Sequence, residues 1–172
     1  MGWAGLLADT APAVPPTQVA DLCAGAYAAV VEILAALMAG GGARLTVSMT
    51  HGAHRLGAHR LGGDPVERAL TGGLACYRIY PTADGRYLTV AALEPRFFSR
   101  LCELLGRPEL AEGQYEPDQE PLADELAELF AAKPLATWLE LFDGEDVSVG
   151  PVATLEEAAV QLGRNPSAAG SA

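Results

Sequence analysis

The stretch TGGLACYRIYPTADGRYLTVAALEP, residues 71–95, decides the fold of the second half of the chain. Residues 77–80 form a short β-prone run, 83–85 read Ala-Asp-Gly, and 87–92 continue with apolar β-formers. A turn tripeptide between two such runs predicts a β-hairpin. The hairpin is the element around which the neighbouring helices are expected to pack.

A carboxylate follows the predicted hairpin directly. Glu94 ends the second run, and Pro95 suits the first turn of a helix. The sequence therefore places Glu94 at a strand-to-helix corner. Taken from the residues alone, this glutamate is either an exposed residue at a strand end or an acidic first-turn partner for the helix dipole.

The elements after Pro95 follow from apolar spacing and breaker residues. The spacing predicts amphipathic helices and one strand, separated by an acidic loop. Thr154 and Glu157 have the spacing of a capping box for a last helix. The expected elements are helix 95–105, loop 109–120, helices 122–132 and 135–142, strand 147–152 and a helix from Thr154.

The first part of the chain centres on one apolar helix. Residues 1–20 are rich in Ala and Pro and predict an extended lead-in. A helix is expected from Asp21 to about Ala39, where three glycines stop it. Apart from Glu32 it is apolar all round, which predicts burial against a sheet, a second subunit or both, rather than a membrane span. Residues 43–49 predict a short buried strand.

Charge and cysteine content narrow the function classes. The 172 residues carry a net charge of −11, and thirteen acidic residues lie between Glu103 and Asp146 against two basic ones. Such a surface excludes nucleic-acid backbone binding and indicates a solvated acidic face. Cys23, Cys76 and Cys102 show no CxxC spacing, which predicts buried, reduced thiols in a cytoplasmic protein.

Three histidines gather around a direct duplication. AHRLG occurs at 53–57 and again at 58–62, which brings His51, His54 and His59 close in sequence. On a helix His51 and His54 share a face. No carboxylate or cysteine stands at ligand spacing, so a solvated or partly buried face is expected rather than a metal site.

Two stretches, PPTQVADLCAGAYAAVVEILAAL (15–37) and AALEPRFF (91–98), resemble the family III CoA-transferases, and in particular the branch of the α-methylacyl-CoA racemases. The likeness weakens over 44–70 and returns through GEDVSVGPVATLEEA (144–158). It implies an α/β fold: a long helix and short strand from a Rossmann-like large domain, then a small domain with a hairpin and several helices. It also implies an acyl-CoA thioester as substrate and no covalently bound cofactor.

The resemblance assigns roles to two carboxylates. By itself Asp21 is either a helix N-cap or a carboxylate beside the small-residue turn 24–26, where a ligand can approach the backbone. In the family this position holds the transferase nucleophile, or one of two acid/base groups of the racemases. In the racemase branch a glutamate in the same Glu-Pro setting as Glu94 pairs with the second acid/base, a histidine.

The racemases hold that histidine upstream of the aspartate, and no histidine precedes Asp21 among these residues. Residues for the CoA-binding half are absent too. The chain thus resembles an internal fragment, divided into lead-in 1–20, large-domain segment 21–70, small domain 71–160 and tail 161–172. It is expected to need a complementing chain or a second copy for activity. The alternative is a non-catalytic oligomerisation or interaction module.

Overall fold

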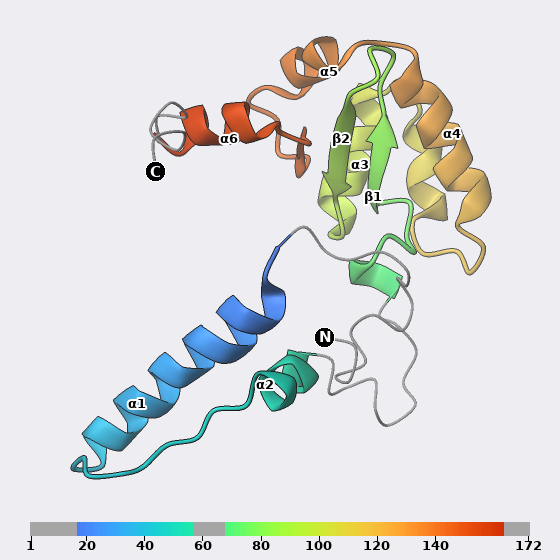
Figure 1. The fold of residues 1–172 in the computed structure, drawn as a ribbon. Coiled ribbons are helices and arrows are strands. Elements are labelled where there is room, and N and C mark those ends of the chain that lie inside the picture. The colour runs from blue at the N-terminus through green and yellow to red at the C-terminus, as the bar shows by residue number, and fades with distance from the viewer. Residues whose placement is uncertain (1–16, 57–67, 164–172) are drawn as a thin grey trace. The chain divides into compact units, whose positions relative to one another are not determined.

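The computed structural model describes residues 17–56 and 68–163 (Figure 1). The chain divides into two compact units, residues 1–66 and 67–172. Helices make up the described part of the first unit, whereas the second combines helices with a three-stranded antiparallel sheet. The mixed α and β character implied by the sequence is confirmed. Residues 1–16 of the predicted lead-in (1–20) and residues 164–172 of the predicted tail (161–172) lie outside the described residues. The end of the predicted lead-in is wrong, because the first helix already begins at Val19.

One long helix opens the first unit. It begins as a π-helical segment, η1 (Val19–Tyr27), and continues as α1 (Ala28–Met38). The helix ends where three successive glycines, at 40, 41 and 42, take positive φ angles of 104°, 75° and 74°. Such angles suit glycine because it lacks a Cβ. The predicted glycine stop is therefore confirmed.

Burial of this helix was expected on most faces and is not found within the first unit. Most of its large apolar side chains are exposed, with Met38 at 90% and Val31 at 65%. By length and composition alone, Val19–Met38 is apolar enough to cross a membrane, with a mean hydropathy of 1.7. Length and composition alone do not identify a membrane span, because core helices of soluble proteins and signal sequences share these properties.

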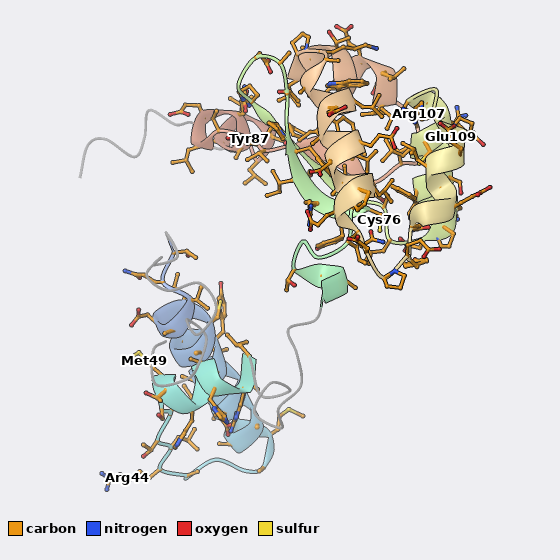
Figure 2. All side chains as sticks on the ribbon, turned by 90° about the vertical axis from the view of Figure 1, so that its right-hand side faces the viewer. Arg44, Met49, Cys76, Tyr87, Arg107 and Glu109 are labelled. Atoms are coloured by element: carbon orange, nitrogen blue, oxygen red, sulfur yellow. The ribbon has the colours of Figure 1, made fainter. Side chains whose placement is uncertain are left out.

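The second helix of this unit packs on η1 through small residues. Ala53 of α2 (Met49–Leu56) and Ala24 of η1 are both buried. Gly52 lies so close to η1 that a Cβ placed on it would stand 2.1 Å from the carbonyl oxygen of Ala24. Met49 lies beside η1 as well (Figure 2). Close approach of two helices over small side chains thus holds the unit together.

The strand predicted over 43–49 is wrong. Residues 43–48 run as irregular, largely exposed backbone, and α2 begins at Met49. A strand needs a neighbour to pair its N–H and C=O groups. Among the described residues the only sheet lies in the second unit, so this segment has no ladder to join.

The predicted hairpin is confirmed in the second unit. β1 (Tyr77–Pro81) pairs antiparallel with β2 (Tyr87–Ala91), and β2 pairs with β3 (Val149–Pro151), which gives the strand order β1-β2-β3. Gly85, at φ +72°, supplies the turn. β3 lies inside the range predicted for it and is shorter. A short helical turn, η3 (Arg68–Leu70), precedes the hairpin.

Helices cover one face of this sheet (Figure 1). Tyr80, Leu88 and Val90 point into a core shared with Phe98 and Leu101 and with the aromatic series Phe130, Trp138 and Phe142. Ring centroids of Tyr80 and Phe130 stand 5.2 Å apart, and those of Phe130 and Trp138 stand 5.4 Å apart. The contributing helices are α3 (Pro95–Leu104), α4 (Glu120–Ala131) and α5 (Leu135–Phe142).

The ends of these elements follow the predicted signals, with one exception. Gly106, at φ +74°, ends α3. Thr154 and Glu157 form the predicted capping box at the start of α6 (Leu155–Gln161). The segment 109–120, expected to be a loop, instead begins with a short 3₁₀ helix, η4 (Pro108–Gly113). Pro108 at its first position favours that start because proline lacks the N–H that a helix N-terminus leaves unpaired.

The cysteine prediction is correct for two residues of three. Cys76 and Cys102 are buried, and Cys76 lies in the interior of the second unit (Figure 2). Burial raises the pKa of the Cys102 thiol to about 12. Cys23 is exposed on η1, contrary to prediction, because the helix that carries it is itself open to solvent.

Acidic side chains of the second unit form ion pairs with arginines of the same unit. Arg100 donates from Nε to Glu145 at 2.9 Å and from Nη1 to Glu103 at 2.9 Å. Arg107 binds Glu109, its neighbour on the surface in Figure 2. These pairs lower the pKa values of Glu109 and Glu145. The acidic surface is therefore partly neutralised by arginines from the same unit.

Candidate functional site around two carboxylates

Glu94 stands at the strand-to-helix corner that the sequence predicts. It is the residue before α3, with extended backbone at φ −71° and ψ 133°, and Pro95 occupies the first helical position. Its carbonyl oxygen accepts the N–H groups of Phe97 and Phe98 at 2.9 and 3.2 Å. Its backbone thus begins the helix.

The Glu94 side chain does not serve that helix. It is exposed and makes no capping hydrogen bond. Among the residues that the structure describes, no ion pair or hydrogen bond engages this carboxylate. A purely structural N-cap accepts a first-turn N–H with its side chain. Glu94 therefore keeps its carboxylate available for another group.

The residues just before Glu94 are fixed by side chains of a distant loop. Gln114 is buried, at 4% exposure, and its Nε2 donates to the carbonyl oxygens of Ala92 at 3.1 Å and Leu93 at 2.9 Å. The Tyr115 hydroxyl also donates to Leu93 O. Burial raises the pKa of Tyr115, and the negative charge of Glu94 contributes to the same shift.

A second buried glutamine supports the loop that carries Gln114. Gln119, at 1% exposure, donates from Nε2 to the carbonyl oxygens of Gly113 at 3.1 Å and Glu116 at 2.7 Å. Its Oε1 accepts the N–H of Ala75 at 3.0 Å. Sequence reasoning missed both glutamines. The one signal was two amide side chains within an otherwise acidic segment, GQYEPDQEP.

The outer face of the hairpin lines an open cleft of about 610 Å³. This face carries Tyr77, Ile79, Thr89 and Ala91, which lie on the side of the strands away from the core. Ala91 is three residues before Glu94. The cleft is within the size range of small-molecule sites.

Asp21 lies in the first turn of η1 and is exposed. The N-cap of the helix is Gln18, and no side chain caps it. The cap interpretation of Asp21 is therefore wrong: the helix begins at Val19, so the aspartate falls inside the first turn. There its charge is favourable toward the positive end of the helix dipole.

The small-residue turn after Asp21 is where α2 meets η1. Ala24 is buried there, and a Cβ placed on Gly25 would stand 3.0 Å from Cγ of Met49. The same region borders a hollow of about 100 Å³ lined in part by Glu32, His51 and Arg55. Asp21 lies near the start of a π-helical segment. This backbone form is rare in proteins, and where it occurs it is often found at functional sites.

The histidines do not form a metal cluster in the part of the chain that the structure describes. His51 and His54 both lie on α2, and the backbone N–H of His51 donates to Oγ of Ser48 at 3.3 Å. His59 lies outside the described residues. Asp21 belongs to the first unit and Glu94 to the second, so a pocket shared by the two carboxylates stays a prediction.

Comparison with known proteins shows to which family the chain belongs. The model of CoA-transferase family III matches residues 1–165, nearly the whole chain. The chain belongs to this family. Both stretches that suggested the resemblance, with Asp21 and Glu94, lie inside the match.

Curated family relatives include racemases and transferases. Mouse α-methylacyl-CoA racemase is 39% identical over 94 residues, which cover 54% of this chain and 25% of the racemase. A CaiB/BaiF CoA-transferase family protein of Caenorhabditis elegans is 29% identical over 164 residues, covering 86% of this chain and 46% of the relative. Mouse succinyl-CoA:glutarate CoA-transferase is 30% identical over 93 residues, or 50% of this chain and 21% of the relative. The chain thus spans from a fifth to just under half of these relatives.

Solved structures of the family share the fold. A hypothetical protein of Mycobacterium tuberculosis, Rv3272, aligns with a TM-score of 0.66 at 26% identity, over 98% of this chain and 49% of that one. A CaiB/BaiF family protein from Brucella suis aligns with a TM-score of 0.60 at 21% identity, over 96% and 48%. The second likeness concerns the fold alone. This family III chain corresponds to about half of each solved structure.

Proposed function

We propose that this family III chain contributes two carboxylates, Asp21 and Glu94, to the handling of an acyl-CoA thioester, by CoA transfer or by inversion at the α-carbon. The observation that carries the proposal is Glu94: an exposed carboxylate, uncommitted among the described residues, on a backbone fixed from both sides. The 39% identity to the racemase over half of the chain favours α-carbon chemistry.

The chemistry requires groups on two faces of the α-carbon. Inversion removes the α-proton on one side and returns a proton on the other, and the enolate formed between these steps needs stabilisation of its oxygen. A carboxylate supplies one acid/base group. Asp21 takes this role in the proposal, and Glu94 orients the second acid/base. In the transferase alternative, Asp21 attacks the thioester carbonyl and displaces the CoA thiolate, giving an acyl anhydride.

The second acid/base and most of the CoA contacts come from outside these 172 residues in the proposal. The racemases place a histidine upstream of the aspartate, and residues 1–20 contain none. A preceding segment or another polypeptide therefore supplies it. The apolar cleft on the outer face of the hairpin, about 610 Å³, is of suitable size and character for an acyl group and supports an acyl thioester as ligand.

Exchange of the α-proton into solvent tests the proposal. The full chain is mixed with the N-terminal half of a family member, and loss of the α-proton of a 2-methylacyl-CoA in D₂O is followed by NMR. We expect Asp21→Asn to lower the exchange rate by about 10²- to 10⁴-fold, as removal of an acid/base group does. Glu94→Gln should also lower it, because the second acid/base loses the carboxylate that orients it. Glu128→Gln, an exposed acid on α4, is the matched control. Equal rates in all three variants would refute the assignment.

One observation favours a second function. The apolar side chains of the 19–38 helix are exposed within the first unit, Met38 at 90% and Leu37 at 64%. An exposed apolar stripe of this kind marks an interaction surface. We therefore also propose a homo-oligomeric chain or a chain bound to a partner through this helix. Light scattering tests it, and a monodisperse monomer at high concentration would count against it.

A further inference from the structure

We propose that Gln114 is a positioning residue for Glu94: its buried amide holds the two peptide groups that precede the glutamate and so fixes the backbone point from which the carboxylate extends. Tyr115 is a second contact of the same kind. The inference rests on the proposed function of Glu94. It follows from the paired hydrogen bonds to Ala92 and Leu93 described above.

The planar geometry of the peptide group explains how a hydrogen bond to Leu93 O restrains the backbone of Glu94. A peptide unit is planar, so its carbonyl oxygen and the next residue's nitrogen move together. Leu93 O belongs to the same plane as the nitrogen of Glu94. Gln114 Nε2 binds that oxygen at 2.9 Å, and the Tyr115 hydroxyl binds it too. The plane on which Glu94 depends is thereby fixed by two side chains.

Further backbone hydrogen bonds hold the chain on either side of these two peptide groups. The N–H of Ala91 donates to Ser148 O at 2.9 Å, and the N–H of Ala92 donates to Cys76 O at 2.8 Å. On the far side, the Glu94 carbonyl accepts from the first turn of α3. The backbone on both sides of Glu94 is held, while its side chain is left exposed. Such an arrangement fixes the Cα and the Cα–Cβ direction from which the carboxylate extends before any substrate arrives.

Glutamine suits this position for a chemical reason. Its amide carries two N–H donors and is neutral, so it satisfies two carbonyl oxygens in a buried place without the cost of burying a charge. A methionine of similar length removes the glutamine donor from both oxygens and leaves Leu93 O with the Tyr115 hydroxyl alone. A glutamate presents only acceptors to them. The functional consequence of losing Gln114 should therefore reach Glu94 through the backbone.

Hydrogen exchange tests the hold independently of catalysis. In the full chain, Gln114→Met should raise the exchange rate of the amides between Leu93 and Phe98 by about tenfold, as expected for the loss of two hydrogen bonds. Thr82→Val is the matched control. It removes a buried hydroxyl that donates to Asp84 at 2.5 Å, at the opposite end of the hairpin.

The control should leave the amides near Glu94 unchanged. Equal effects of Gln114→Met and Thr82→Val on these amides, or no effect of Gln114→Met, would overturn the inference. Tyr115→Phe, at an exposed position, serves where Gln114→Met does not fold. It should raise the same exchange rates by a smaller factor, and an unchanged rate in that variant would likewise count against the hold.

Activity then separates this inference from the proposed function. In the complemented α-proton exchange assay, Gln114→Met should lower kcat about tenfold or more in the wild-type background. It should add nothing in the Glu94→Gln background, because it acts through that residue. Full additivity would overturn the positioning role. An inactive wild-type mixture refutes the proposed function, and hydrogen exchange then decides whether Gln114 holds the Glu94 backbone.

Discussion

Arg86 and Glu157 lie 71 residues apart in the sequence and form a two-bond ion pair, at 2.8 and 3.2 Å. The same glutamate accepts the N–H of Thr154 at 2.7 Å and so completes the capping box of α6. Arg86 also donates to the carbonyl oxygen of Val152 at 3.3 Å. One carboxylate therefore both starts α6 and ties it to the hairpin.

Substitution of Arg86 should weaken the attachment of α6 to the hairpin. In Arg86→Ala the capping box remains but the tie to the hairpin is lost, so amides of α6 should lose exchange protection while those of α3 and α4 keep theirs. Arg86→Lys should recover only part of the protection, because lysine lacks the two-pronged geometry of the guanidinium. Hydrogen exchange with mass spectrometry measures this. Unchanged protection of α6 in Arg86→Ala would show that the pair is unimportant for docking.

Acid should weaken the second unit through Glu145. Its bond to Arg100 lowers its pKa below the ordinary value of 4.5. A carboxyl whose pKa is lower in the folded state contributes stability above its unfolded pKa, and this contribution disappears as the pH falls through the folded pKa. Thermal unfolding of Glu145→Gln should thus differ from wild type above pH 4.5 and converge with it at lower pH. A constant difference across this range would contradict the assignment.

The contact between Gly52 and Ala24 predicts a sensitive position in the first unit. A Cβ at Gly52 would stand 2.1 Å from the Ala24 carbonyl oxygen, so Gly52→Ala must push α2 away from η1. We expect a loss of about 1–3 kcal/mol, typical of overpacking. Gly150→Ala is the control, since the nearest atom to its new Cβ stands at 3.8 Å. Chemical denaturation followed by exchange of the α2 amides measures both.

The three cysteine thiols should react with an alkylating reagent at different rates. Cys23 is exposed, whereas burial keeps the pKa of Cys76 and Cys102 raised, with Cys102 at about 12. Since the thiolate is the reactive form, a maleimide at neutral pH should label Cys23 rapidly and the other two only after denaturation. Mass spectrometry counts the labels. Fast labelling of a second thiol in the native protein would show that the core opens, or that the assigned burial is wrong.

Local chemistry accounts for what the sequence predicts well. The turn at Gly85, the helix start at Pro95 and the capping box at Thr154 each depend on residues within a few positions of one another. Such signals act whatever the rest of the chain does. Glu94 was located correctly because its position follows from two of these local signals, a strand end and a proline.

Predictions that depended on distant partners were less successful. The expected strand at 43–49 has apolar residues but no pairing strand among the described residues, and the helix 19–38 is not covered within its own unit. An apolar pattern shows that a segment is suited to burial without showing what buries it. Gln114 was missed for the same reason, because its hydrogen-bond partners lie 21 and 22 residues earlier.

The glycine triplet after α1 has a stereochemical consequence. All three residues hold positive φ, and a Cβ added at any of them would meet nothing within 4 Å. An L-residue is therefore disfavoured at these positions because of the left-handed backbone conformation, and not because its side chain would clash. A mirror-image residue such as D-alanine, introduced at position 41 by chemical ligation, prefers this backbone region and would stiffen the unfolded chain, adding about 0.4–1 kcal/mol of stability where L-alanine would lose it.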